Sequence, residues 1–275
     1  MKLDIVEIED KYCKLVVEGV NPYVVNALRR VLLAEVPKLA IENITFYDNT
    51  SALFDEIVAH RLALVPIPTD PSTLNRVGEV DAEGNPAYVV RFTLTKEGPG
   101  MVYSGDLECE DKAFAVVDPK IPIVELLKDQ RLILEATAIL GRGTDHAKWQ
   151  VCQAVGYKYF PTAHVDNGKI PEEMRKVAVE TTPHGILGLD GGKLVVLQPD
   201  EVNRADDVER MVVPSGANAG KRLKDVGGFE VAYDDRKFVF QFETDGSLKA
   251  DDALLKAVEL LKERFKAFSD AVEAL

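Results

Sequence analysis

The alternation of apolar and polar residues predicts a chain rich in β-strands. Asp10-Lys11 and Asp234-Asp235 favour turns between strands, and short helices are expected at 53–63 and 122–128. An exposed loop or hairpin is expected at 72–87, and a region with many turns at 160–220. The predicted strands are 2–8, 12–18, 39–47, 88–96, 101–109, 113–118, 131–140, 228–233 and 237–243.

The first helix should begin at Asn21-Pro22, because Asn is a good N-cap and Pro suits the first helical position. It should end near Glu35, before Pro37. Apolar residues surround it on nearly every side, apart from a polar stripe of Asn26, Arg29 and Arg30. A helix of this kind is buried on nearly every side, so it needs either a deep core or a partner.

A long helix is predicted at the C-terminus, with Ser247 as its N-cap. An adjacent row of alanines would let another backbone approach closely. The helix either lies across the chain's own sheet or is shared with a partner, and its length and apolar stripe favour a partner. The stripe follows a heptad spacing through Leu254, Val258, Leu261, Phe265, Phe268, Val272 and Leu275.

Composition narrows the class of protein. Apolar residues make up 46% of the 275 residues, enough for a substantial core. The net charge of −13 argues against binding DNA or RNA directly, since such binding places cations against phosphates. The three cysteines are far apart, which argues against a disulfide framework or a zinc site. No segment resembles a membrane span or signal peptide, so a cytoplasmic protein without membrane partners is expected.

Two short patterns could carry chemistry. Glu56 and His60 are four residues apart and share a helix face, as two metal ligands would, but no second His lies near them. Gly141-Arg142-Gly143 begins like a dinucleotide-binding loop without its last glycine, and favours a tight turn that presents His146, Lys148 and Trp149 for protein contact. A stand-alone metal- or nucleotide-binding enzyme using Glu56, His60 and His146 is the alternative function.

Three blocks of sequence point to a known family. The run Asn26-Ala27-Leu28-Arg29-Arg30-Val31-Leu32-Leu33 resembles the first helix of the alpha-like subunits of cellular RNA polymerases. The resemblance continues through Asn49-Thr50-Ser51 and 55–67, and again at 141–149. In this order the blocks are similar to archaeal D-type subunits, which are related to the eukaryotic third-largest subunit and to the bacterial alpha N-terminal domain.

The resemblance implies an α+β fold with a split alpha-like dimerisation domain at 1–47 and 221–275. It implies an inserted β-rich domain at 48–164 and a degenerate ferredoxin-like subdomain at 165–220. It also implies a non-catalytic assembly subunit of a nucleotidyltransferase, DNA-directed RNA polymerase. The expected partners are the small alpha-like subunit L, the small subunits N and P, and the two large subunits that hold the catalytic magnesium, with DNA contacted only indirectly.

The site residues implied by the resemblance fall into three groups. The first helix would contact the partner through Asn26, Leu28, Arg29, Arg30, Leu32 and Leu33, and the C-terminal helix through Leu254, Val258, Leu261, Phe265, Phe268 and Val272. The surface facing other subunits would include His60, Arg61, His146, Lys148 and Trp149.

The ferredoxin-like subdomain of some relatives holds an iron–sulfur cluster through cysteines. A faint internal repeat places Pro183-His184-Gly185-Ile186 and Pro214-Ser215-Gly216-Ala217 in equivalent positions. Pro183 and Pro214 stand where a Cys-Pro would close each repeat, and no cysteine follows Cys152. We therefore expect no cluster and no other cofactor, with the subdomain held by Ile186, Leu187, Leu189, Val195, Val196 and Val212. A homodimer, as in the bacterial relatives, is a third possibility that the length of the insert disfavours.

Overall fold

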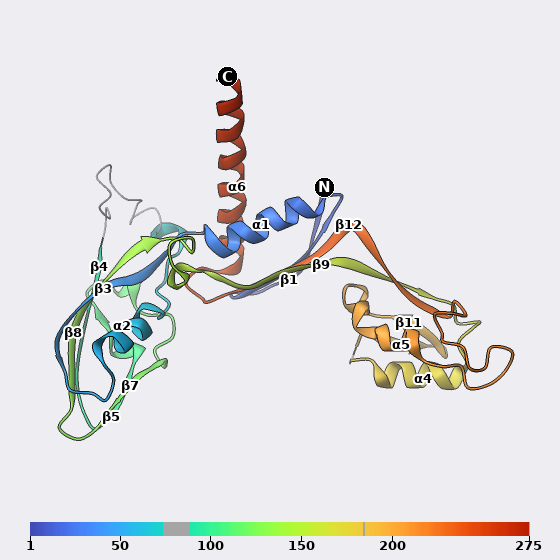
Figure 1. The fold of residues 1–275 in the computed structure, drawn as a ribbon, viewed down its shortest axis with the longest axis horizontal. Helices are drawn as coiled ribbons and strands as arrows, with labels where there is room; N and C mark the ends of the chain where they lie inside the picture. The colour runs from blue at the N-terminus through green and yellow to red at the C-terminus, as the bar shows by residue number, and fades with distance from the viewer. Residues whose placement is uncertain (74–88, 184, 275) are drawn as a thin grey trace. The chain divides into compact units, whose positions relative to one another are not determined.

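The computed structural model describes residues 1–73, 89–183 and 185–274, so the loop or hairpin expected at 72–87 lies almost entirely outside the described residues (Figure 1). The α-helices are α1 (Pro22–Ala34), α2 (Asp55–Ala63), α4 (Glu172–Thr181), α5 (Asp206–Arg210) and α6 (Ala250–Glu273). Short 3₁₀ helices are η1 (Ser104–Asp106), η2 (Lys112–Phe114), η3 (Ala147–Trp149) and η4 (Pro199–Ala205). The strands are β1 (Lys2–Ile8), β2 (Tyr12–Glu18), β3 (Lys38–Asn49), β4 (Val90–Glu97), β5 (Gly100–Tyr103), β6 (Glu108–Cys109), β7 (Pro122–Leu126), β8 (Arg131–Gly141), β9 (Cys152–Val165), β10 (Leu187–Asp190), β11 (Lys193–Val196) and β12 (Phe229–Thr244).

The chain divides into two compact units. The first unit comprises Met1–Ile5, Leu15–Val25 and Tyr157–Phe240, and the second comprises Val6–Lys14, Asn26–Gly156 and Gln241–Leu275. Strands of a four-stranded sheet, in the order β1-β2-β12-β9, contribute residues to both units. The fold is therefore a mixed α/β chain with several antiparallel sheets.

The second unit is built on a sheet with the strand order β3-β8-β4-β6. In Figure 1 the three longer strands run side by side with α2 beside them. The antiparallel register pairs Leu94 of β4 with Leu134 of β8. Alternate residues of these strands are buried, together with Val58 and Leu62 of α2, in one apolar core. Alternation with period two therefore predicts the core of this unit well, since one face of the sheet is buried.

The first unit has a separate core around the hairpin β10-β11, α4, η4 and α5. Ile186 and Leu187 are buried as expected, and Val195 and Val196 are partly buried. Leu189 and Val212 are exposed, so their expected core role is wrong. The core instead depends on helical and flanking residues that the strand pattern did not reveal: Met174, Ala178, Leu194, Val202, Val208, Val213, Leu223 and Phe229.

Several predicted elements differ in the structure. The expected helix at 122–128 is strand β7, because Ile123 and Val124 are β-branched residues that are buried in a strand paired with β5. The expected strand at 101–109 is interrupted by η1, where the Asp106 carboxylate accepts a hydrogen bond from the backbone N–H of Tyr103 at 2.7 Å. The strand expected at 113–118 is replaced by the 3₁₀ turn η2.

The two C-terminal strands are one long strand, β12, and the turn expected at Asp234-Asp235 is wrong. The polar residues there are an exposed stretch of strand between two buried segments. The 14-residue strand β9 was not predicted, and its last residues replace turns expected after residue 160. The predicted strands at 2–8, 12–18, 39–47, 88–96 and 131–140, and the helices at 22–35 and 53–63, are confirmed within a few residues.

The C-terminal helix is confirmed, but it begins at Ala250 without a side-chain cap. Ser247 is not the N-cap, since its Oγ donates to Asp245 Oδ1 at 2.6 Å in a turn before the helix. None of the helices in the described part of the chain has both the length and the apolar composition that a lipid bilayer requires.

Candidate partner-binding surface on helices α1 and α6

The first half of α6 is covered by the chain itself through a row of small residues. Ala250, Ala253 and Ala257 are fully buried, and Leu260 ends this contact. The heptad stripe lies beside this row rather than on it. Leu254 and Leu261 are half-buried, and Val258 is exposed. The helix therefore uses its alanine row and Leu260 for its own fold, leaves Leu254 and Leu261 half-buried, and leaves Val258 exposed.

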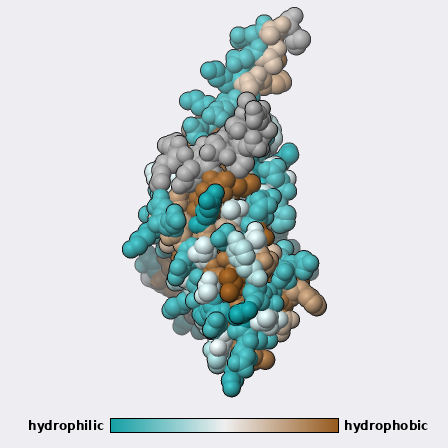
Figure 2. All heavy atoms as spheres, turned by 90° about the vertical axis from the view of Figure 1, so that its left-hand side faces the viewer, coloured by the Kyte–Doolittle hydropathy of each residue, from teal (hydrophilic) through white to brown (hydrophobic). Residues whose placement is uncertain are grey.

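The second half of α6 is not covered by any described part of the chain. Every residue from Lys262 to Ala274 is exposed, and Phe265, Phe268 and Val272 are 68%, 70% and 52% exposed. Figure 2 shows the end of this helix at the top of the view, teal on one side and light brown on the other. An isolated soluble chain rarely exposes aromatic side chains in a row, so this surface has the character of a protein contact. Leu275, the last member of the stripe, lies outside the described residues.

The predicted contact residues of helix α1 differ in how far their side chains are buried in the chain's own fold. Leu28 and Leu33 are half-buried, Arg30 is exposed, and Arg29 Nε donates to Asn26 Oδ1 at 3.1 Å. Leu32 is 1% exposed, because its side chain packs inside its own chain. The expected contact of Leu32 with a partner is therefore wrong.

Ion pairs join the end of α1 to α6, and join the residues just before α6 to other parts of the second unit. Arg264, on the uncovered half of α6, pairs with Glu35 at the end of α1 at 2.8 Å. At the base of α6, Lys38 forms a buried ion pair with Asp245, and Lys249 pairs with Asp10 at 3.1 Å. The segment just before α6 and the beginning of its uncovered half are therefore tied to neighbouring elements by charge.

These ion pairs were not predicted, because nothing in the local sequence marks Lys38 or Glu35 as buried. Lys38 stands between Pro37 and Leu39, and its partner is more than two hundred residues away in sequence. Only the folded chain brings such residues together.

The turn at Gly141-Arg142-Gly143 is packed inside the chain. The indole of Trp149 lies over Gly141, where a Cβ would come within 2.3 Å of the ring. Trp149 Nε1 donates to the Ile139 carbonyl at 3.3 Å, and Lys148 Nζ donates to the Ile41 carbonyl at 3.0 Å and pairs with Glu42. The expectation that this turn presents Lys148 and Trp149 to another protein is therefore wrong, because both side chains are buried.

The remaining predicted surface residues are exposed. His60 and Arg61 lie on the outer side of α2, where Arg61 donates to the Pro122 carbonyl at 2.7 Å. His146 is also exposed, and its Nδ1 accepts a hydrogen bond from the backbone N–H of Lys148 at 3.0 Å. His146 thus caps η3, a role that needs no ligand.

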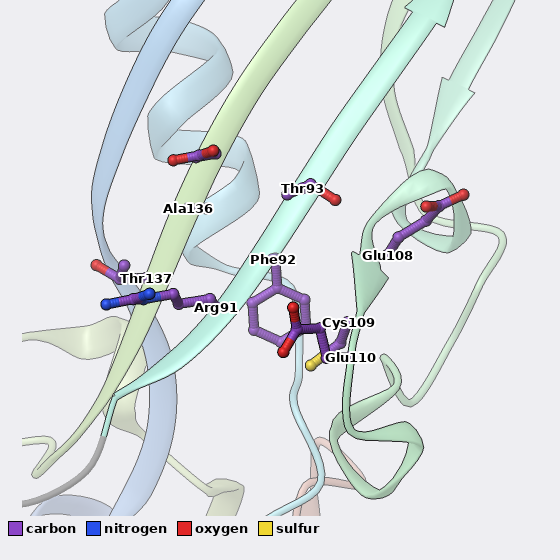
Figure 3. A pocket seen from close by; sticks show the side chains of 9 residues that line it. Arg91, Phe92, Thr93, Glu108, Cys109, Glu110, Ala136 and Thr137 are labelled. Carbon is purple, nitrogen blue, oxygen red and sulfur yellow. The ribbon is translucent and has the colours of Figure 1, made fainter.

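A groove on the sheet of the second unit is lined by residues of β4, β6 and β8. Figure 3 shows Arg91 extending toward Thr137 of the neighbouring strand, and Phe92 beside Cys109. Three glutamates and one arginine line the groove, so its charge does not suit a phosphate group. Its lining residues are Arg91, Phe92, Thr93, Glu108, Cys109, Glu110, Glu135, Ala136 and Thr137.

The described residues contain no group of three potential metal ligands, and Glu56, His60 and His146 form no such group. Burial raises the pKa of the Cys13 thiol to about 11 and that of Cys152 to about 12, so both thiols stay protonated at neutral pH. The alternative of a stand-alone metal- or nucleotide-binding enzyme is not supported.

The sequence of the second unit matches a known domain. Residues 41–157 match the model of the RNA polymerase Rpb3/RpoA insert domain. Most of the sheet β3-β8-β4-β6, together with α2 and the turn that holds Trp149, falls within this match. The class of protein is therefore that of the alpha-like RNA polymerase subunits.

Relatives extend over nearly the whole chain. DNA-directed RNA polymerase subunit Rpo3 of Methanothermobacter thermautotrophicus is 40% identical over 270 residues, 96% of this chain and 96% of that protein. The Rpo3 subunit of Methanosarcina acetivorans is 38% identical, covering 95% and 94%, and that of Pyrococcus furiosus is 35% identical, covering 100% and 98%. The chain belongs to the family of the archaeal DNA-directed RNA polymerase subunit Rpo3. It is a non-catalytic assembly subunit of a nucleotidyltransferase complex.

Proposed function

We propose that α1 and the uncovered half of α6 join this chain to the small alpha-like polymerase subunit, called L in archaea. The exposure of Phe265, Phe268 and Val272 carries this proposal. A helix that projects its aromatic residues from its own fold can bury them against a second amphipathic helix. The half-buried Leu28 and Leu33 of α1 would extend the same contact.

The finer architecture is part of the same proposal. The dimerisation domain would be split between 1–47 and 221–275, around an inserted β-rich domain at 48–164. The subdomain at 165–220 would be ferredoxin-like without an iron–sulfur cluster, since no cysteine follows Cys152. Its separate apolar core supports a fold that needs no cofactor.

The further partners would be the small subunits N and P and the two large subunits. The exposed His60, Arg61 and His146 would face these subunits. DNA would be reached only through the large subunits, because a net charge of −13 repels phosphates. The complex would work in the cytoplasm.

Co-purification with subunit L tests the proposal. The double variant Phe265→Ser/Phe268→Ser removes two exposed rings, so the isolated chain should keep its stability within about 0.5 kcal/mol. Its affinity for L should fall by at least about a hundredfold, since two buried aromatic contacts each contribute roughly 2 kcal/mol at an interface centre. The affinity can be measured by competition against labelled wild-type chain.

The matched control is Glu263→Ser/Asp270→Ser, which changes two exposed residues on the opposite side of the same helix. It should bind L like the wild type. Equal affinity for the Phe variant and the wild type would refute the proposal. Light scattering of the chain without L separates a heterodimer from the homodimer expected of bacterial relatives.

A further inference from the structure

We infer that the Gly141–Thr144 turn is a positioning element for the α1 part of the partner-binding surface. The inference rests on the proposed function, since it concerns the same surface. It assigns to the turn neither a ligand nor a direct contact with the partner.

The turn contacts the C-terminal end of α1 through its backbone. The Thr144 N–H donates to the Ala34 carbonyl at 2.9 Å, which satisfies one of the carbonyls that a helix end leaves free. Gly143 lies so close that a Cβ there would come within 2.8 Å of the Leu33 carbonyl oxygen and 3.2 Å of Ala34 Cα. The close approach therefore requires glycine at position 143.

The end of α1 is held on a second side by α6. Glu35 follows the helix directly, and its carboxylate pairs with Arg264 on the uncovered half of α6. Glu35 is buried while Arg264 is largely exposed, so the ion pair reaches from the core to the predicted contact surface. The turn and this ion pair together set the position of Leu33 relative to the stripe of α6.

A Cβ at position 143 meets backbone atoms, which cannot rotate away as a flexible side chain can. The last turn of α1 must therefore shift, and Leu33 shifts with it. Two helices that form one contact surface lose affinity when either is displaced, because interface cores are closely packed. The effect on the partner is indirect and should be moderate.

The test compares Gly143→Ala with the wild type in binding to subunit L. The dissociation constant should rise about three- to thirtyfold, the range of indirect couplings of this kind. Hydrogen exchange of the Thr144 amide should become faster, since its bond to Ala34 is stretched. Gly156→Ala is the matched control, because the nearest atom to a Cβ there is 3.9 Å away.

A second control separates positioning from general loss of stability. Phe92→Leu weakens the core of the same unit far from α1 in sequence. Its affinity for L should be unchanged when binding is measured well below its unfolding midpoint.

A further pair of variants covers the case in which Gly143→Ala does not fold. Gly143→Ala/Gln150→Ala relieves the 3.1 Å contact with the Gln150 side chain and keeps only the close approach to the backbone of α1. Its affinity for L should be lower than that of Gln150→Ala, and equal affinity would overturn the inference. Wild-type affinity in the Gly143 variant overturns the inference alone, whereas wild-type affinity in the Phe265/Phe268 variant overturns the proposed function.

Discussion

Replacing Lys38 with Met should destabilise the second unit strongly. The side chains of Lys38 and Asp245 are 4% and 9% exposed, so their ion pair is shielded from water. Met has nearly the shape of Lys without its charge. The variant therefore leaves the Asp245 carboxylate buried without its cation.

The expected loss in the free energy of unfolding depends on the hydrogen-bond partners that Asp245 keeps. Breaking a buried ion pair by removing one member costs roughly 3–5 kcal/mol. Asp245 still accepts hydrogen bonds from the Ser247 N–H at 2.9 Å and from Ser247 Oγ at 2.6 Å, which favours the lower end. A loss of about 3 kcal/mol lowers the melting temperature by about 6–12 °C for a unit of this size.

Thermal and urea unfolding of Lys38→Met, Asp245→Asn and the double variant measure this loss. The double variant removes both charges, so it should recover most of the stability. A Lys38→Met melting temperature within about 2 °C of the wild type would refute the argument, and so would a double variant no more stable than Lys38→Met.

Three further predictions concern stability. Arg175 donates to the carbonyls of Asn167, Ile170 and Gly192 at 2.6, 2.9 and 2.8 Å, so Arg175→Met should cost the first unit about 2–3 kcal/mol in urea unfolding. Gly141→Ala should cost about 1–3 kcal/mol and shift the fluorescence of Trp149 to the red, while Gly156→Ala should change neither. Burial raises the pKa of Cys13 from 9.0 to about 11, so the unfolded thiol ionises first and stability should fall from about pH 9 to 11. Cys13→Ala should reduce that fall, and an unchanged slope would contradict the assigned burial.

The parts of the fold that local patterns predict are those with a single clear period. The strands 88–96 and 131–140 alternate with period two, and their buried residues follow that alternation. The segment 122–128 has no clear period, and pairing with β5 decides that it is a strand. The polar pair Asp234-Asp235 is typical of a turn, but the pairing of β12 within its sheet keeps it extended.

The sequence predicts the candidate surface only on α6, because only there do the apolar residues follow a single clear period. The heptad spacing identified Phe265, Phe268 and Val272 as a continuous stripe, and their exposure agrees with an unfilled contact. The expected contacts of Leu32, Lys148 and Trp149 were wrong, because a motif does not say which side of an element its own chain covers.

The sequence by itself determined the family and the long C-terminal helix, since each depends on residue identity and local spacing. Only the tertiary structure decided which face of α6 is buried, that Gly143 touches the end of α1, and that Lys38 meets Asp245. The physical reason is that burial and ion pairing depend on atoms distant in sequence, whose approach is set by packing and not by local propensity.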